Sequence, residues 1–217
     1  MDERALLRLM LWLSPAFPTG GFAYSQGLEW AVAAGDVADG ASLARWLEDT
    51  LAHGQGLADA MLLRAAHRAH DEPARLAELA ELAAAAALPR ERAEETLAQG
   101  GAFLRAARCW PPCPPAGLPL AYPLAVGALA GLHAIAEEAA AAAFLAAQAA
   151  ALVSAAVRLV PLGQSAGLAV LAGLEPALLA LAARSAHIPL ADLGGSAWRA
   201  EIAAMRHETQ ATRLFRS

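Results

Sequence analysis

Apolar residues recur along most of this chain at the three- and four-residue spacing of an α-helix. The first such stripe consists of Leu6, Leu9, Met10 and Leu13. Side chains at this spacing share one face of a helix, which can then pack against a core. Similar patterns predict further helices over residues 27–34, 43–51, 57–70, 75–88, 89–108, 122–136, 137–159, 162–174, 176–185 and 199–208. The sequence therefore predicts a multi-helix bundle.

Two segments rich in proline or glycine interrupt the helical pattern. Residues 14–21 contain two prolines followed by a Gly-Gly pair, which fixes a turn rather than a flexible linker. Residues 109–119 form a proline-rich break near the midpoint of the chain. This second break is either a domain boundary or a loop between two halves of one bundle. Because both halves have the same helical character, we expect a single domain over residues 1–217.

The composition supports an all-α fold. Alanine occupies 61 of the 217 positions and aromatic residues only 6%. Alanine and leucine are strong helix formers, and long β-branched runs typical of strands are missing. A Gly100–Gly101 pair lies inside the helix predicted over residues 89–108. Since glycine weakens a helix, this pair indicates close backbone packing or a bend.

The charged residues exclude several classes of function. All 16 basic residues are arginine, so the chain has no lysine for phosphate contact in a nucleotide site or for a Schiff base. If the protein works with a nucleotide, we therefore expect a partner to carry the hydrolytic site. The net charge of −5 argues against binding of nucleic acid.

Three features indicate a cytoplasmic protein without a membrane span. The first four residues are acidic overall, where a secretory signal would be basic. Two cysteines, Cys109 and Cys113, do not make a disulfide framework. Residues 139–157 carry no charge, but their high alanine content favours a buried helix over a membrane-spanning one.

One short motif offers an alternative function. Residues 163–167 (Gly-Gln-Ser-Ala-Gly) match the nucleophile elbow of α/β-hydrolases, and Asp192 and His207 follow Ser165 in the order of a catalytic triad. The parallel sheet that holds such an elbow is absent from the pattern. A helix that starts after Pro161 explains the same residues, so a serine hydrolase remains the alternative interpretation.

The candidate metal ligands are weak. Cys109 and Cys113 are separated by a spacing that is unusual for zinc, and no second cysteine pair accompanies them. His67 and His70 are three residues apart and share a helix face, which is a weak transition-metal pair. We therefore expect no metal site, no cofactor and no catalytic residue.

Two segments are unusual for a globular chain. In a protein poor in aromatic residues, four lie in or just after the first turn: Phe17, Phe22, Tyr24 and Trp30. The sequence ends with Leu214 and Phe215 between Arg213 and Arg216. Such an apolar pair docks either on the protein's own core or on another protein. We expect it to anchor a partner, so that deletion of residues 213–217 would leave the melting temperature nearly unchanged.

Several blocks of the sequence together resemble one known family. Residues 14–29 (SPAFPTGGFAYSQGLE) resemble the N-terminal signature of the urease accessory protein UreF family. Residues 158–164 (RLVPLGQ) resemble its second signature, residues 207–217 (HETQATRLFRS) its tail, and residues 91–101 a looser block. The blocks occur in the family's order and span nearly the whole chain. In this resemblance Ser165 merely follows the Pro-Leu-Gly-Gln pattern.

The resemblance implies an all-α, non-enzymatic, cytoplasmic protein of nickel-urease maturation that forms a homodimer. It implies binding to the accessory protein UreD (also called UreH) and recruitment of the GTPase UreG. Together these proteins would act on apo-urease and couple GTP hydrolysis to nickel delivery. Carried over by position, the expected UreD contacts are His207, Glu208, Gln210, Arg213, Leu214, Phe215, Arg216 and Ser217. The residues expected on the UreG side are Arg158, Tyr24 and Glu29.

Overall fold

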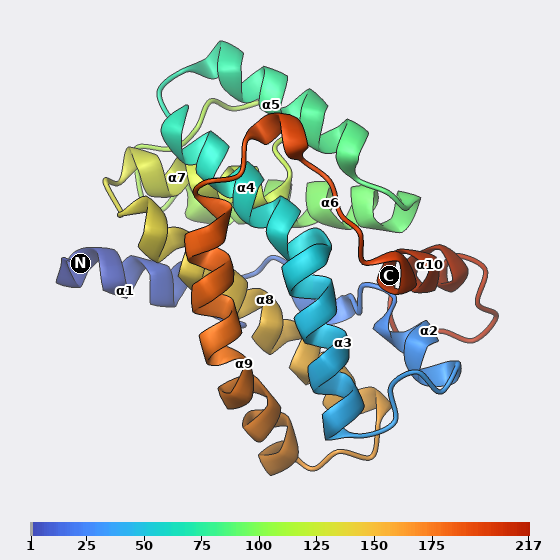
Figure 1. The fold of residues 1–217 in the computed structure, drawn as a ribbon. Coiled ribbons are helices and arrows are strands. Elements are labelled where there is room, and N and C mark those ends of the chain that lie inside the picture. The colour runs from blue at the N-terminus through green and yellow to red at the C-terminus, as the bar shows by residue number, and fades with distance from the viewer. Residues whose placement is uncertain (1) are drawn as a thin grey trace.

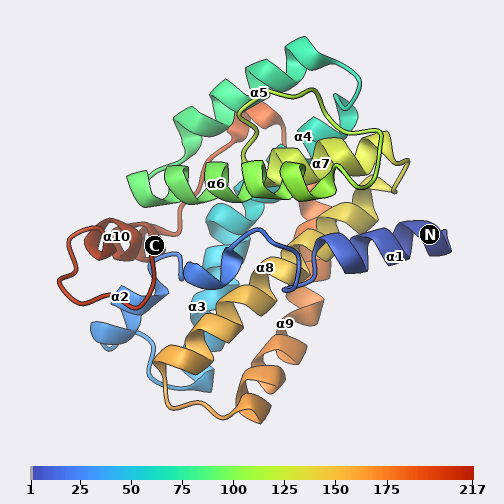
Figure 2. The ribbon, with the colours of Figure 1, turned by 180° about the vertical axis from the view of Figure 1, so that it is seen from behind.

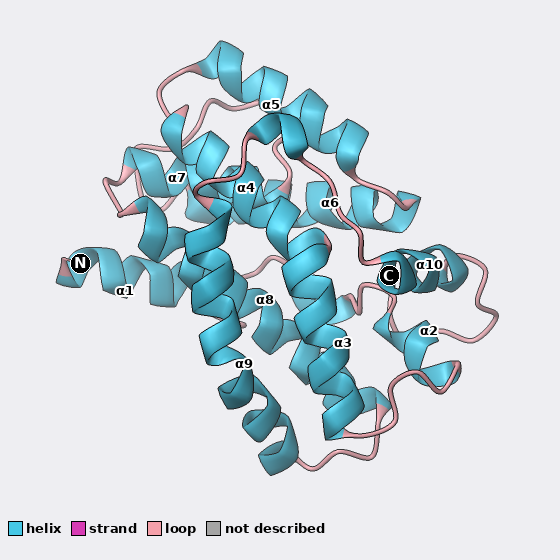
Figure 3. Ribbon diagram, viewed as in Figure 1, coloured by secondary structure: helices cyan, strands magenta, loops and turns pink. Residues whose placement is uncertain are grey.

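Helices make up the regular structure of residues 2–217, the part of the chain that the computed structural model describes (Figure 3). The α-helices are α1 (Glu3–Trp12), α2 (Leu28–Ala33), α3 (Gly40–His53), α4 (Gln55–Arg68), α5 (Pro73–Ala86), α6 (Arg90–Ala107), α7 (Tyr122–Leu132), α8 (Glu137–Leu159), α9 (Gln164–Ser185) and α10 (Trp198–His207). Two short 3₁₀ turns are η1 (Gly21–Ala23) and η2 (Leu190–Asp192). No strand occurs among the described residues, which confirms the all-α prediction.

The closest helix pair of the fold is α4 and α7, which lie side by side near its centre (Figure 1). Every residue of α7 from Pro123 to Gly131 is buried. Glycines let the two backbones touch. A methyl group added at Gly127 would lie 2.0 Å from the carbonyl oxygen of Leu63, and one at Gly131 would lie 2.6 Å from that of His67. Such distances are far below van der Waals contact, so only glycine fits at these positions.

Helix α6 packs against α7 and covers it from behind (Figure 2). A methyl group at Gly100 would lie 2.1 Å from the carbonyl oxygen of Leu120, in the loop that leads into α7. Gly100 therefore serves close backbone packing, one of the two roles predicted for the glycine pair, whereas a methyl group at Gly101 would meet only the Arg105 side chain. The proline-rich residues 108–121 connect α6 to α7.

A second core lies where α8 meets α2, α3 and α9. Helices α3 and α9 run next to each other in front of α8 (Figure 1). The large apolar side chains of this core include Leu28, Leu43, Leu47, Leu152, Leu174 and Phe215. Residues from the two ends of the sequence thus meet in one core.

The buried face of helix α1 only partly matches the predicted stripe, of which Leu9 is buried and Leu13 packs against the core. Its buried residues are Ala5, Leu9 and Trp12. Leu6 and Met10, which belong to the predicted stripe, are 45% and 65% exposed. The indole of Trp12 determines this orientation because it packs against Trp110 and His133, with ring centroids 6.3 Å and 5.2 Å apart.

The two helices predicted over residues 162–174 and 176–185 are one helix, so this prediction was wrong. Helix α9 continues through Pro176. A proline inside a helix removes the hydrogen bond to the carbonyl four residues earlier. Here that residue, Ala172, is exposed, and Pro176 is exposed as well. Water can therefore hydrate the free carbonyl, and the helix is not broken.

Helix α7 also ends earlier than predicted. The pattern extended it to residue 136, but it stops at Leu132. Ala134 adopts a φ of 52°, in the left-handed region that ends a right-handed helix. The chain then turns directly into α8.

Helices α8 and α9 are long and apolar enough to cross a membrane, judged by length and composition alone. The core helix of a soluble protein passes the same test. Half of the most apolar window of α8 is buried inside the protein, and this helix contributes side chains to both cores. The prediction of a buried helix over residues 139–157 is therefore confirmed.

Candidate functional site

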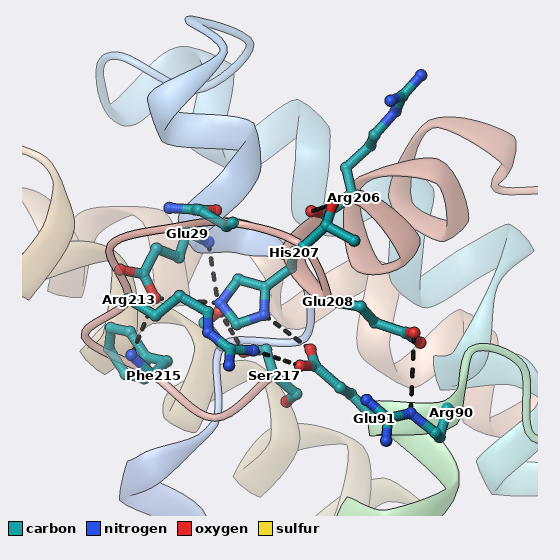
Figure 4. Close-up of polar contacts among 12 residues, drawn as sticks. Glu29, Arg90, Glu91, Arg206, His207, Glu208, Arg213, Phe215 and Ser217 are labelled. Atoms are coloured by element: carbon teal, nitrogen blue, oxygen red, sulfur yellow. Dashed lines mark hydrogen bonds and ion pairs between the residues drawn. The ribbon is translucent and has the colours of Figure 1, made fainter.

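The last residues of the chain, from His207 at the end of α10 to Ser217, form an irregular segment with several bends that lies against α2 and α6 (Figure 4). We call this segment the tail. Its side chains alternate near the end: Phe215 and Ser217 are each 4% exposed, whereas Leu214 is 65% exposed. The expected apolar pair is thus divided, with Phe215 in the protein's own core and Leu214 in solvent.

Glu29 of α2 is the main acceptor for the tail backbone. One carboxylate oxygen accepts a hydrogen bond from the amide of Leu214 at 2.6 Å, and the other accepts one from the amide of Phe215 at 2.9 Å. Gly27, just before α2, brings α10 close, because a methyl group there would lie 2.6 Å from the nitrogen of Ala204. The glycine of the first signature therefore allows α10 and its tail to reach Glu29.

Glu91, in the first turn of α6, holds the tail from the other side. One of its carboxylate oxygens lies 2.7 Å from Nδ1 of His207, and the other accepts a hydrogen bond from Arg213 at 2.6 Å. Nε2 of His207 lies 3.2 Å from the Glu29 carboxylate. The fully buried His207 ring therefore sits between two carboxylates (Figure 4).

The tail also joins the segment that follows the N-terminal turn. Ser25 donates to the main-chain oxygen of Ser217 from both its amide and its hydroxyl, at 2.7 Å and 2.5 Å. The amide of Arg216 donates to the carbonyl of Ala23 at 2.8 Å. The Ser217 hydroxyl donates to Glu95 of α6 at 2.8 Å. Two segments that the sequence marked as unusual are thus bound directly to each other.

Arg158, near the end of α8, contacts both segments. Its guanidinium lies 4.4 Å from the ring centroid of Phe215, which is a cation–π contact. It also donates to the carbonyl of Phe22 in the turn at 3.0 Å. The side chain of Phe22 itself is 77% exposed. Arg158 therefore fixes the turn and the tail relative to each other.

A cavity of about 110 Å³ lies next to the tail. Its polar lining includes Gln26, Thr50, Asp59, Arg92, Glu95 and Ser217. Asp59 forms an ion pair with Arg92, and burial raises the pKa of the Asp59 carboxyl despite this neighbour. The buried hydroxyl of Thr50 has no protein partner. The cavity has room for several water molecules, which would satisfy this hydroxyl.

The remaining predicted residues lie around this cluster. Tyr24 is half-buried, Arg216 is exposed, and Glu208 lies 3.9 Å from Arg90. Gln210 donates to the carbonyl of Thr212. The prediction that these positions form an interface with other proteins stays a prediction. What the structure adds is that Glu29, His207, Phe215 and Ser217 already bind within the chain.

Several residues that bind the tail were not predicted from the sequence. Ser25, Glu91 and Glu95 carry the contacts, yet the sequence pattern assigned no such role to the two glutamates. Both glutamates fall within the looser family block at residues 91–101, which was the available signal.

The hydrolase interpretation is wrong. Ser165 lies exposed in the first turn of α9, and the residues before it belong to the end of α8 and a loop rather than to a strand. His207 is buried and bound to two glutamates. As predicted, a helix begins after Pro161.

The weak metal candidates are occupied by other contacts. Nε2 of His67 lies 2.7 Å from the carbonyl of Ile135, and Nδ1 of His70 lies 2.9 Å from that of His67. Cys109 and Cys113 are free thiols, and burial raises the pKa of Cys113. Within residues 2–217, no group of three or more histidine, cysteine or acidic side chains is arranged to hold a metal ion.

Comparisons with known proteins place this arrangement in a family. The family model of UreF matches residues 37–175. A urease accessory protein UreF from Rhizobium leguminosarum bv. viciae is 56% identical over 218 residues, covering all of this chain and 98% of the relative. One from Bradyrhizobium sp. (strain ORS 278) is 52% identical over 98% of this chain and 92% of its own length. One from Rhodopseudomonas palustris (strain TIE-1) is 49% identical over all of this chain and 94% of its own length. The chain therefore belongs to the UreF family of urease accessory proteins.

Proposed function

We propose that this protein is a non-enzymatic, cytoplasmic adaptor that joins UreD (UreH) to the GTPase UreG during urease maturation. Through this complex it helps couple GTP hydrolysis to the insertion of nickel, the cargo, into apo-urease. The absence of lysine supports the division of labour, since a partner then supplies the phosphate-contacting site. In the same proposal the protein works as a homodimer and does not bind nucleic acid.

The observation that carries the adaptor proposal is the outer face of α10, the helix that leads into the tail. Trp198, Ile202 and Met205 are 66%, 47% and 52% exposed and are spaced four and three residues apart, so they share one face. Leu214 of the tail is also exposed. Exposed apolar anchors of this kind dominate protein interfaces. We assign this face, rather than the buried Phe215, as the apolar anchor for UreD.

In this proposal UreG binds at the end of α8 and the N-terminal turn. Arg158 and Phe22 are exposed next to the tail, and Tyr24 is half-buried beside them. Glu29 is buried, so its contribution is to hold the tail in place rather than to touch a partner. The other predicted UreD contacts with exposed side chains are Arg213 and Arg216.

Co-purification with separately expressed UreD tests this assignment. A double variant with Ile202→Ser and Met205→Ser should weaken binding by about two orders of magnitude or more, because each apolar side chain of this size contributes roughly 1.5–3 kcal/mol when buried. The circular dichroism spectrum and melting temperature should stay close to those of the parent, since both side chains are exposed in the free protein.

The matched control replaces exposed leucines of another helix, Leu168→Ser and Leu179→Ser in α9. It should bind UreD normally. Normal UreD binding by the folded α10 variant would contradict the proposed anchor. GTP turnover by the purified chain alone, with no UreG present, would contradict the adaptor role.

A further inference from the structure

His207 is a fully buried histidine whose two ring nitrogens both face carboxylate oxygens (Figure 4). Nδ1 lies 2.7 Å from Glu91 and Nε2 lies 3.2 Å from Glu29. A neutral imidazole carries one N–H and one lone pair, so it can donate only one of these hydrogen bonds. With both glutamates ionised, the two contacts are satisfied at once only when both nitrogens carry a proton.

The two carboxylates leave only one oxygen, on Glu91, that could hold this proton instead. The oxygens of Glu29 accept the amides of Leu214 and Phe215, and one of them also faces His207. The oxygens of Glu91 are divided between Arg213 and His207. Protonating Glu29, or the Glu91 oxygen that accepts from Arg213, would place an O–H against an existing donor. The other Glu91 oxygen faces only Nδ1 of His207, so these two groups share a single proton. The hydrogen-bond pattern therefore requires one proton held between His207 and Glu91.

The charges of the cluster balance while this proton is bound, and we place it on the imidazole. Two negative charges, on Glu29 and Glu91, face two positive charges, on Arg213 and His207. His207 is the last residue of α10, and the negative end of the helix dipole also favours a cation there. Other charged groups nearby pair elsewhere or face solvent: Arg90 with Glu208, Arg92 with Asp59 and Glu95, and the exposed Arg206.

We propose that His207 is a pH-sensitive clasp for the tail. When His207 loses its proton, one ring nitrogen turns a lone pair towards a buried carboxylate oxygen. Of the two negative charges on Glu29 and Glu91, one then has no positive partner. A buried charge without a partner is strongly unfavourable. The stabilisation of the docked tail is therefore present while His207 is protonated and is lost as the pH rises. The amides of Leu214 and Phe215, which end on Glu29, are released first.

Nuclear magnetic resonance of the full chain tests the clasp directly. Ring nitrogen shifts give the protonation state of His207, and hydrogen exchange, corrected for the intrinsic rate at each pH, gives the protection of the Leu214 and Phe215 amides. Measured from about pH 5 to about pH 9, a range that brackets histidine titration in proteins, protection should fall at least about tenfold as His207 loses its proton. Amides of Leu63 and Leu129 in α4 and α7 provide the internal reference and should keep their protection.

Two variants complete the test. In His207→Gln the tail amides should be weakly protected at every pH, with no titration step. In His187→Gln, which changes an exposed histidine outside the cluster, the wild-type step should persist. A tail that stays equally protected while His207 deprotonates would overturn the proposal, and so would a neutral His207 in the docked tail. Because the wild-type titration alone decides both points, the proposal stays testable even if His207→Gln fails to fold.

Discussion

The region around α7 and the region around the tail are both buried, but they are held together by different means. Between α4 and α7, glycines bring backbone against backbone, and no charged side chain lies on α7. The tail is held by ion pairs, in which His207 and Arg213 of the tail contact Glu29 and Glu91. Burial alone therefore does not determine which substitutions destabilise a given part of this protein. The α7 region should respond to added volume, and the tail to altered charge.

The largest expected effect comes from adding one methyl group to the α7 region. Gly127→Ala should lower the free energy of unfolding by about 3 kcal/mol or more, because the new atom meets the Leu63 carbonyl and the helices must separate. Urea unfolding measures the loss. The control, Gly173→Ala, adds the same group in α9, where no atom lies within 4 Å. It should be neutral or stabilise the protein by up to about 1 kcal/mol. Equal stabilities of the two variants would contradict close packing at Gly127.

A smaller effect is expected from a change of charge without a change of size under the tail. In Glu29→Gln only one oxygen remains to accept two amides and His207, so docking should weaken by about 2 kcal/mol. Trypsin cleavage after Arg213 should accelerate by roughly 30-fold at equal protease. Glu175→Gln, at an exposed position in α9, should be cleaved like the parent. Unchanged cleavage of Glu29→Gln would show that the carboxylate does not hold the tail.

The smallest expected effect sharpens the comparison between the buried His207 and the half-buried His133. Burial beside Trp12 lowers the pKa of His133 below its ordinary value of 6.5, with a further contribution from Arg8. The unfolded chain therefore binds the proton first, and the free energy of unfolding should fall as the pH drops through 6.5 towards the lowered value. The tail is expected to loosen in the opposite direction, on raising the pH. Urea unfolding of wild type and His133→Gln at several pH values isolates the contribution of His133 to the free energy of unfolding. If the two proteins show parallel pH profiles, His133 makes no such contribution.

The tail shows where prediction from the sequence stopped. Its importance was visible from Leu214 and Phe215 between two arginines, and from the family resemblance. The division of this pair was not, because it depends on a bend at both residues, where their consecutive amides bind Glu29 of a distant helix. Phe215 enters the core while Leu214 faces solvent. With Phe215 and Ser217 buried, deletion of residues 213–217 should lower the melting temperature, contrary to the expectation from the sequence.

The helices were largely predictable because the spacing of their apolar residues is a local property of the sequence. The residues that bind the tail could not be predicted in this way. Glu29 and Glu91 bind residues more than a hundred positions away. Nothing in a local pattern distinguishes such a buried glutamate from one that caps a helix in solvent. The errors in α1 and α9 have the same origin. The Trp12 contacts and the solvent exposure of Pro176 are tertiary facts that outweigh helical periodicity and proline's local preference.

The pairing of α4 with α7 has a consequence for synthesis on the ribosome. These neighbours are separated in the sequence by α5, α6 and the proline-rich loop, so α4 emerges well before the helix that covers it. At about 5–20 residues per second, the delay lasts several seconds. During this time the side of α4 that carries Leu63 and Ala66 is uncovered in the nascent chain. Between the emergence of α4 and that of α7, the growing polypeptide therefore exposes apolar surface on which chaperones can act.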